Sequence, residues 1–218
     1  MVLLQLVVFC INIMKKNAKC VYIPPLTDLS EEKWQKTNIE EDDILRIVYA
    51  GSPGRDKDKL NIILDSLQHC NLTNIKFNII GITEKQYLSI YPGDAELLNK
   101  LKDVICFMGR MSHLDVIDEL KKSDFSLFYR EISGVTTAGF PTKFTESISC
   151  GVPVITNRTS DLAEYLEDGV NGYWIDDIQN DLKRILDKDI SELKSIKKNI
   201  KRETFDYHNY IDEMKKLF

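Results

Sequence analysis

The chain has few of the residues that build metal centres and disulfide frameworks. Its five cysteines are scattered without any Cys-x-x-Cys pair, and its three histidines are not spaced with them as zinc ligands. Neither a disulfide framework nor a zinc site is therefore expected, and free thiols fit a reducing compartment such as the cytoplasm. We expect no metal and no resident cofactor.

Long apolar runs and an excess of positive charge are also lacking. The segment from Val2 to Met14 is apolar apart from Gln5 and Asn12, but it is shorter than the roughly 18 residues that mark a membrane span. It also lacks the basic start and the cleavage site of a signal peptide. The net charge of −5 argues against nucleic acid as a partner.

Two common nucleotide-binding loops are missing as well. No Gly-x-x-x-x-Gly-Lys-Ser/Thr occurs, which excludes a P-loop, and no Gly-x-Gly-x-x-Gly follows the first predicted strand, which disfavours a dinucleotide site. The content of 43% hydrophobic and 29% charged residues is ordinary for a globular protein. At 218 residues the chain is long enough for one sizeable domain with appended segments.

Buried strands and amphipathic helices alternate from about residue 45 onward. The stripe of Leu60, Ile63, Leu64 and Leu67 has helical spacing. Because parallel strands need crossover connections, this alternation predicts an α/β fold: a Rossmann-like, doubly wound parallel sheet of about six strands with helices on both faces. The predicted strands are Arg46–Ala50, Ile75–Ile80, Val104–Met108, Phe125–Tyr129, Val152–Thr156 and Tyr173–Ile175.

Composition changes divide the chain into three parts. Residues 1–43 are interpreted as the remnant of a preceding N-terminal domain and a charge-rich linker, and residues 44–203 as the sheet domain. Charged helical segments without strand character follow the last strand, and residues 204–218 are predicted to form a C-terminal helix.

The topology predicts where a ligand binds. In the strand order 3-2-1-4-5-6, the crevice opens between the first and fourth strands, at the carboxyl edge of the sheet. The loops that face it are residues 51–59 and 130–140, and both contain glycines and basic side chains. We therefore expect a nucleotide diphosphate, held by Arg55 and Lys57 on one side and by a helix N-terminus on the other.

The segment from Ala138 to Ile155 combines a glycine turn, a helix start and a buried strand. Gly139 lets the backbone approach a ligand closely, and Pro141 suits the first position of a helix. Lys143 can reach a phosphate, and Glu146 can accept hydrogen bonds from a ligand hydroxyl.

Each candidate also has a simpler interpretation. The basic residues of the first loop alternate with acidic ones, as in a solvated charged loop. Arg130 can pair with Glu131 or another nearby carboxylate, and Glu146 can complement the helix dipole. None of the three histidines is predicted as a base, so no catalytic residue is assigned.

These residues resemble the retaining glycosyltransferases of family 4, also called glycosyl transferases group 1, which have the GT-B fold. The resemblance covers about Ile44 to Ile175. The segment from Ala138 to Ile155 is similar to the family signature of two glutamates separated by seven residues, followed by a helix of small residues and Cys-Gly-x-Pro-Val-Ile. The resemblance implies the C-terminal, donor-binding half of a GT-B enzyme, with the N-terminal acceptor domain missing from this chain.

The resemblance also implies residue roles. Glu146 matches the second glutamate, which binds the ribose hydroxyls, and Phe140 to Lys143, including Thr142, match the loop that contacts the donor sugar and phosphates. Ala138 stands where the family has its first glutamate, so the contact of that carboxylate with the sugar does not carry over.

Two further loops are assigned in the same way. Many members have Gly-Arg followed by Lys-Gly after the first strand, and these two basic side chains bind the diphosphate. Here Gly51 is followed by Ser52, and the resemblance implies Arg55 and Lys57 as substitutes for the pair. The loop that begins with Gly109 and Arg110 resembles the part that lies against the nucleobase. The predicted ligand-binding residues are Gly51, Gly54, Arg55, Lys57, Gly109, Arg110, Arg130, Gly139, Phe140, Thr142, Lys143 and Glu146.

The function implied is that of a hexosyltransferase in polysaccharide synthesis, which moves a sugar from a UDP- or GDP-sugar to a glycan or lipid-linked acceptor. Without an acceptor domain the chain alone is expected to bind donor and turn over little, and contact with a membrane surface is expected only through the missing half. Two alternatives stay open. Ala138 fits a non-catalytic nucleotide-sugar-binding or regulatory subunit, and a nucleotide-sugar epimerase would need more carboxylates and a histidine in the cleft.

Overall fold

Six parallel strands form the centre of the structure, a computed structural model that describes residues 21–35, 42–53 and 57–216. Their order is β3-β2-β1-β4-β5-β6, which confirms the predicted Rossmann-like sheet and places the reversal of strand order between β1 and β4. The strands are β1 (Leu45–Ala50), β2 (Ile75–Ile80), β3 (Ile105–Gly109), β4 (Phe125–Leu127), β5 (Val154–Thr156) and β6 (Gly172–Trp174).

The two strands at the reversal point differ in how far they pair. The β1–β2 ladder runs from Leu45↔Ile75 to Ala50↔Ile80, whereas the β1–β4 ladder ends at Val48↔Ser126. The ladder on the β4 side therefore stops before β1 does. This early end lies where a switch-point crevice is expected.

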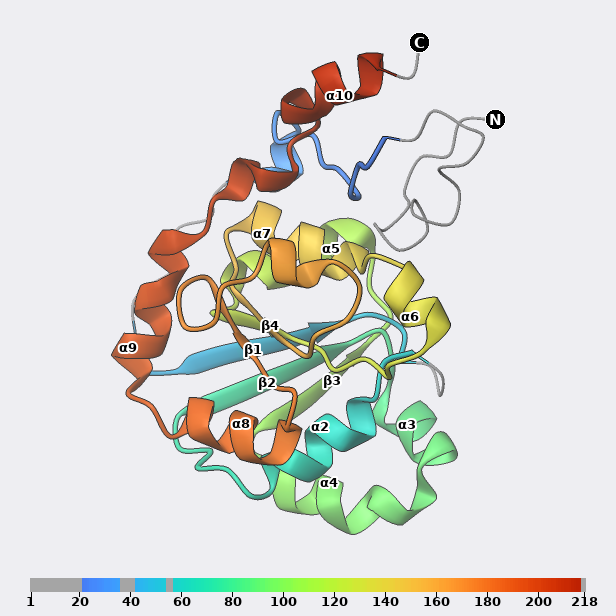
Figure 1. Cartoon of the computed structure of the whole chain (residues 1–218). Helices are drawn as coiled ribbons and strands as arrows, with labels where there is room; N and C mark the ends of the chain where they lie inside the picture. The colour runs from blue at the N-terminus through green and yellow to red at the C-terminus, as the bar shows by residue number, and fades with distance from the viewer. Residues whose placement is uncertain (1–20, 36–41, 54–56, 217–218) are drawn as a thin grey trace.

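Helices cover both faces of the sheet (Figure 1). On one face α2 packs against α8, and on the other α5 packs against α7 and β1. The helices are α2 (Leu60–Leu67), α3 (Glu84–Ile90), α4 (Ala95–Leu101), α5 (His113–Lys122), α6 (Gly134–Ala138), α7 (Thr142–Cys150), α8 (Ile178–Leu186), α9 (Ile190–Ser195) and α10 (Ile211–Lys215). Short 3-10 helices are η1 (Glu32–Trp34), η2 (Pro92–Asp94), η3 (Leu162–Glu164), η4 (Ile196–Asn199), η5 (Arg202–Phe205) and η6 (Tyr207–Tyr210).

Apolar periodicity explains the two layers. The predicted stripe of α2 is buried, and it belongs to a core that includes Ile47 and Tyr49 of β1. The intervening residue Val48 points to the other face and packs with Ile117 of α5. Successive residues of a strand face opposite sides, so β1 contributes to both cores and is buried on both faces.

The C-terminal segment differs from the single helix predicted for residues 204–218. It consists of the end of η5, then η6 and α10. The break falls at Asp206, whose backbone is extended and forms a parallel bridge with Thr27. The Thr27 N–H donates to Phe205 O, and Tyr207 N–H donates to Thr27 O, both at 2.9 Å. Pairing with this distant segment replaces helical hydrogen bonds that the sequence alone favours.

The described part of the predicted linker is packed onto the sheet domain. Trp34 is buried in the same core as Val48 and Ile117, and the Thr27 hydroxyl lies 2.9 Å from the Ser149 hydroxyl of α7. Arg202 donates from Nε to Ser149 O at 2.8 Å and also to Trp34 O. The proposed domain boundaries stay a prediction, and residues 1–20 lie outside the described residues.

The described residues also bear on membrane, metal and thiol chemistry. Among their helices, none has the length and apolar character needed to span a membrane. No group of three or more His, Cys, Asp or Glu side chains in these ranges is arranged to hold a metal ion. Cys70, Cys106 and Cys150 are free thiols, and burial raises the pKa of Cys150 to about 12, which makes it a packing residue rather than a nucleophile.

Candidate functional site at the carboxyl edge of the sheet

The two loops that the topology selects lie side by side. Lys59 N–H donates to Tyr129 O, and Glu131 N–H donates to Lys57 O, both at 2.9 Å. Between these bonds Asp58 and Arg130 form an antiparallel bridge. Backbone hydrogen bonds therefore fix the loop after β1 to the loop after β4. No local sequence pattern predicts this pairing.

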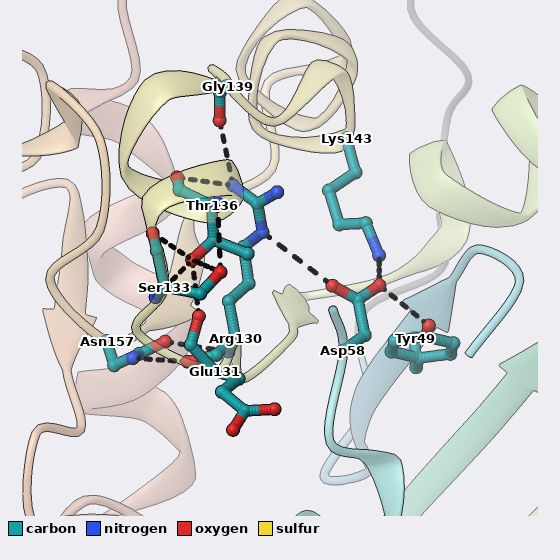
Figure 2. Close-up of polar contacts among 9 residues, drawn as sticks. All are labelled: Tyr49, Asp58, Arg130, Glu131, Ser133, Thr136, Gly139, Lys143 and Asn157. Carbon is teal, nitrogen blue, oxygen red and sulfur yellow. Dashed lines mark hydrogen bonds and ion pairs between the residues drawn. The ribbon is translucent and has the colours of Figure 1, made fainter. Parts of the chain in front are cut away.

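A buried carboxylate sits at the centre of this junction. Asp58 Oδ2 accepts a hydrogen bond from the Tyr49 hydroxyl at 2.9 Å and another from Lys143 Nζ. Arg130 Nε lies 3.8 Å from the other carboxylate oxygen. Lys143 and Arg130 approach Asp58 from different sides, and Tyr49 closes the group from β1 (Figure 2). Asp58 and Arg130 are each only 7% exposed.

Arg130 also shapes the segment that leads into α7. Its Nη1 donates to Gly139 O at 3.0 Å and to Thr136 O at 3.4 Å. Its backbone is held in turn by Asn157, which accepts from Arg130 N–H and donates to Arg130 O, both at 2.8 Å. Ser133 and Thr136 form a capping box that starts α6. One guanidinium therefore connects Asp58 with the end of α6 and the approach to α7 (Figure 2).

Burial and charge oppose each other in this cluster. Burial lowers the pKa of Lys143 and of Arg130, and the carboxylate of Asp58 opposes both shifts. Burial raises the pKa of Tyr49, so its hydroxyl stays protonated as a donor. The cluster itself contains two basic side chains and one carboxylate, and the Glu146 carboxylate also acts on Lys143.

Two glycines let the loops approach this closely. A Cβ on Gly51 would lie 2.7 Å from Lys143 Nζ, so the missing side chain leaves room for the ammonium group. Gly81 follows β2 with a φ of +107°, and a Cβ there would lie 1.8 Å from Gly51 O. Gly81 N–H also donates to Gly109 O at 2.7 Å. The loops after β1, β2 and β3 are stacked through these positions.

Glu146 lies on α7 and faces the start of α5. One of its carboxylate oxygens is 3.0 Å from His113 Nε2, and its side chain keeps 27% exposure. Pro141 stands just before α7, which begins at Thr142, so Glu146 falls in the second helical turn. A carboxylate there interacts weakly with the helix dipole, which acts within the first turn. That simpler interpretation of Glu146 is therefore not favoured.

A cleft of about 490 Å³ opens beside Glu146. Glu146 and Thr142 line it from α7, and His113 lines it from α5. The segment before β1 lines the other side of the cleft with residues that include Asp28 and Trp34. The cleft can therefore receive a polar ligand beside a carboxylate, an imidazole and a hydroxyl.

The other predicted residues are placed differently. Lys57 and Arg110 are exposed, and Gly54 and Arg55 lie outside the described residues. Phe140 takes part in an aromatic cluster, with its ring centroid 6.0 Å from that of Phe144 and 5.9 Å from that of Phe205. Its side chain contributes to the core beneath α7.

The sequence does not predict a site role for three residues at this edge of the sheet. Asp58 alternates with basic neighbours, and such a pattern does not say which side chain turns inward. Tyr49 reads as part of a buried strand, although a tyrosine near the end of a strand is a signal that a hydroxyl is available at the carboxyl edge. His113 precedes a predicted helix, and only the fold brings it to Glu146.

The doubly wound parallel sheet defines a Rossmann-like fold, and a charged junction lies at its switch point. The chain belongs to the glycosyl transferases group 1 family, whose model matches residues 30–203. Among curated proteins, none has a significant sequence match to the chain.

Solved structures share the fold at low identity. One is Anabaena Alr3699/HepE in complex with UDP, at 15% identity and a TM-score of 0.65, over 90% of this chain and 56% of that one. Another is sucrose-phosphate synthase from Thermosynechococcus elongatus, at 18% identity and a TM-score of 0.67, over 93% and 52%. A third is the lipopolysaccharide outer core galactosyltransferase WaaB in its apo form, at 19% identity and a TM-score of 0.64, over 94% and 57%. The chain thus spans a little over half the length of these structures.

Proposed function

We propose that the chain is the donor-binding part of a retaining glycosyltransferase, which transfers a sugar from a nucleotide-diphosphate sugar to a glycan or lipid-linked acceptor in polysaccharide synthesis. The observation that carries the proposal is the convergence of Lys143 and Arg130 at the β1–β4 switch point, with Glu146 on the same helix as Lys143. Membership in the glycosyl transferases group 1 family supports it.

Each group has a chemical task in this proposal. The two cations contact the diphosphate and stabilise the negative charge that develops on it when the sugar bond breaks. Glu146 accepts hydrogen bonds from the ribose hydroxyls, and His113 orients its carboxylate. The nucleobase lies near Gly109 and Arg110. The binding of UDP by the HepE structure is consistent with this class of ligand.

A second half of the enzyme completes the proposal. The similar structures are longer than this chain, which covers 56% of the HepE chain. We assign the acceptor site to an additional domain of that kind, as well as any contact with a membrane surface. On this proposal, residues 1–218 bind the donor in the cytoplasm without a metal and turn over little by themselves.

Thermal unfolding with added nucleotides tests donor binding. UDP or GDP is expected to raise the midpoint of unfolding, since a ligand that binds only the folded state stabilises it. Glu146→Ala should reduce that shift. Glu192→Ala is the matched control, because Glu192 lies on α9 and pairs with Lys188, and neither residue belongs to the candidate site. No shift with any nucleotide, or an equal shift in Glu146→Ala and wild type, argues against the site.

Ala138 supports a second candidate function, a nucleotide-sugar-binding subunit that does not catalyse transfer. It ends α6 at the position where the family signature has its first glutamate. The test is a transfer assay in which the acceptor half is supplied, either as a separate chain or in the full-length protein. Donor binding without transfer supports the subunit, and transfer that requires Glu146 supports the enzyme.

A further inference from the structure

The Asp58 carboxylate occupies the position from which an anionic ligand would contact Lys143 and Arg130. It contacts the partly buried Lys143 and lies beside the buried Arg130, so it pairs with both cations in place of a ligand. The Tyr49 hydroxyl donates to the same oxygen as Lys143. Two cations that could serve a phosphate are thus directed at one carboxylate, which the Tyr49 hydroxyl also holds (Figure 2).

We propose that the Asp58 carboxylate is a resident counter-anion that the diphosphate of the ligand displaces from Lys143 and Arg130. The inference rests on the proposed function, and it adds a residue that limits affinity for the diphosphate. When phosphate oxygens take over the two cations, the Asp58 side chain turns away. Its backbone stays in the bridge to Arg130, so the exchange needs only side-chain rotation.

The diphosphate is expected to replace the Asp58 carboxylate at the two cations rather than to bind beside it. A diphosphate beside an ionised Asp58 would place like charges together in a poorly solvated junction, which is unfavourable. The same carboxylate keeps the cations paired when the site is empty, because an unpaired buried charge is costly. Asp58 therefore stabilises the free protein and weakens the complex.

The exchange has a consequence for turnover. The carboxylate competes for the same cations at every encounter, so it lowers the affinity for the free nucleoside diphosphate. A sugar-transfer reaction leaves that diphosphate in the site, and its release is required before new donor binds. Asp58 is placed to return to Lys143 as the product leaves. It acts as a specificity-determining residue for diphosphate affinity and not as a catalytic residue.

Calorimetric titration of inorganic pyrophosphate tests the exchange directly. Asp58→Asn keeps the shape of the side chain and removes its charge, and we expect it to bind pyrophosphate about tenfold tighter than wild type. Tyr49→Phe removes a hydrogen bond that holds the carboxylate, and we expect it to tighten binding about threefold. If Asp58→Asn does not fold, Tyr49→Phe decides the outcome.

Asp118→Asn is the matched control, since it removes the same charge from an ion pair with Lys121 on α5 that lies apart from the cluster. It should bind pyrophosphate as wild type does. Unchanged or weaker pyrophosphate binding by Asp58→Asn overturns the proposal, and so does an absence of binding by both wild type and Asp58→Asn. Titration with UDP separates this result from the proposed function: if UDP binds no tighter than pyrophosphate, the nucleotide site fails while the exchange at Asp58 still stands.

Discussion

Two neighbouring residues of α7 connect the helix to regions of opposite character. Phe144 packs into an aromatic cluster, with its ring centroid 5.9 Å from that of Phe205, which itself lies 4.9 Å from that of Tyr165. Lys143 turns instead to Asp58 in the charged junction between the β1 and β4 loops. The first region is aromatic, with Phe144 and Phe205 fully buried, and the second contains charged side chains that are largely buried.

The difference indicates what each region is for. Burial of aromatic rings stabilises the fold wherever it occurs. A buried ion pair often adds no net stability, because desolvation offsets the attraction between the charges. The aromatic cluster therefore stabilises the position of α7, and the charged junction is the place where the proposed ligand would bind.

The largest effect on stability is expected in the aromatic cluster. Phe205→Ala should lower the free energy of unfolding by about 3–5 kcal/mol, because it leaves a cavity among packed rings. Urea unfolding measures this loss, and Phe205→Leu should lose less. UDP affinity of the folded protein should change little. A large loss of UDP affinity with intact stability would place the cluster in the ligand site instead.

A smaller, selective effect is expected at Glu146. Glu146→Gln should weaken UDP binding about tenfold, since a hydrogen bond to a charged group contributes about 1.5 kcal/mol. Pyrophosphate has no ribose, so its binding should stay unchanged. Calorimetric titration of both ligands checks the difference. Equal weakening for both would mean that Glu146 acts on the phosphates.

The smallest effect is expected from Glu131, the carboxylate next to Arg130. Its partner in the structure is Lys59, at 2.5 Å and with Glu131 47% exposed. Because exposed ion pairs contribute little, Glu131→Gln should change the free energy of unfolding by less than about 1 kcal/mol and leave pyrophosphate affinity unchanged. Denaturant unfolding measures the first quantity, and calorimetric titration with pyrophosphate measures the second. A change as large as that of Asp58→Asn would show that any negative charge near the loops has the same effect.

The sheet and its switch point could be predicted because they depend on local periodicity and on a general rule of topology. Alternating apolar segments predict the parallel sheet and the α2 stripe, and the usual strand order of such sheets predicts the switch point between β1 and β4; the structure has all three. The division of residues 204–218 could not be predicted, because pairing of Asp206 with Thr27 joins segments far apart in the sequence.

The loops of the candidate site could be located from sequence, but their internal pairing could not. The sequence predicts that Arg130 pairs with Glu131 or another nearby carboxylate, and its partner is Asp58. The place of Lys143 at a helix start predicts contact with a phosphate, and the structure directs it to the same carboxylate. Which charged side chain is buried depends on the tertiary contact between two loops, and no spacing within either loop encodes it.

In the proposed function, Lys143 contacts the phosphates of a nucleotide ligand. The most direct measurement compares UDP affinity in Asp58→Asn with that in the double variant Asp58→Asn/Lys143→Met, in which the competing carboxylate is absent from both proteins. Binding by the double variant should be at least about tenfold weaker. Arg130 lacks the Asp58 carboxylate in both proteins, so the comparison isolates Lys143. Equal UDP affinity in the two variants would contradict this role of Lys143.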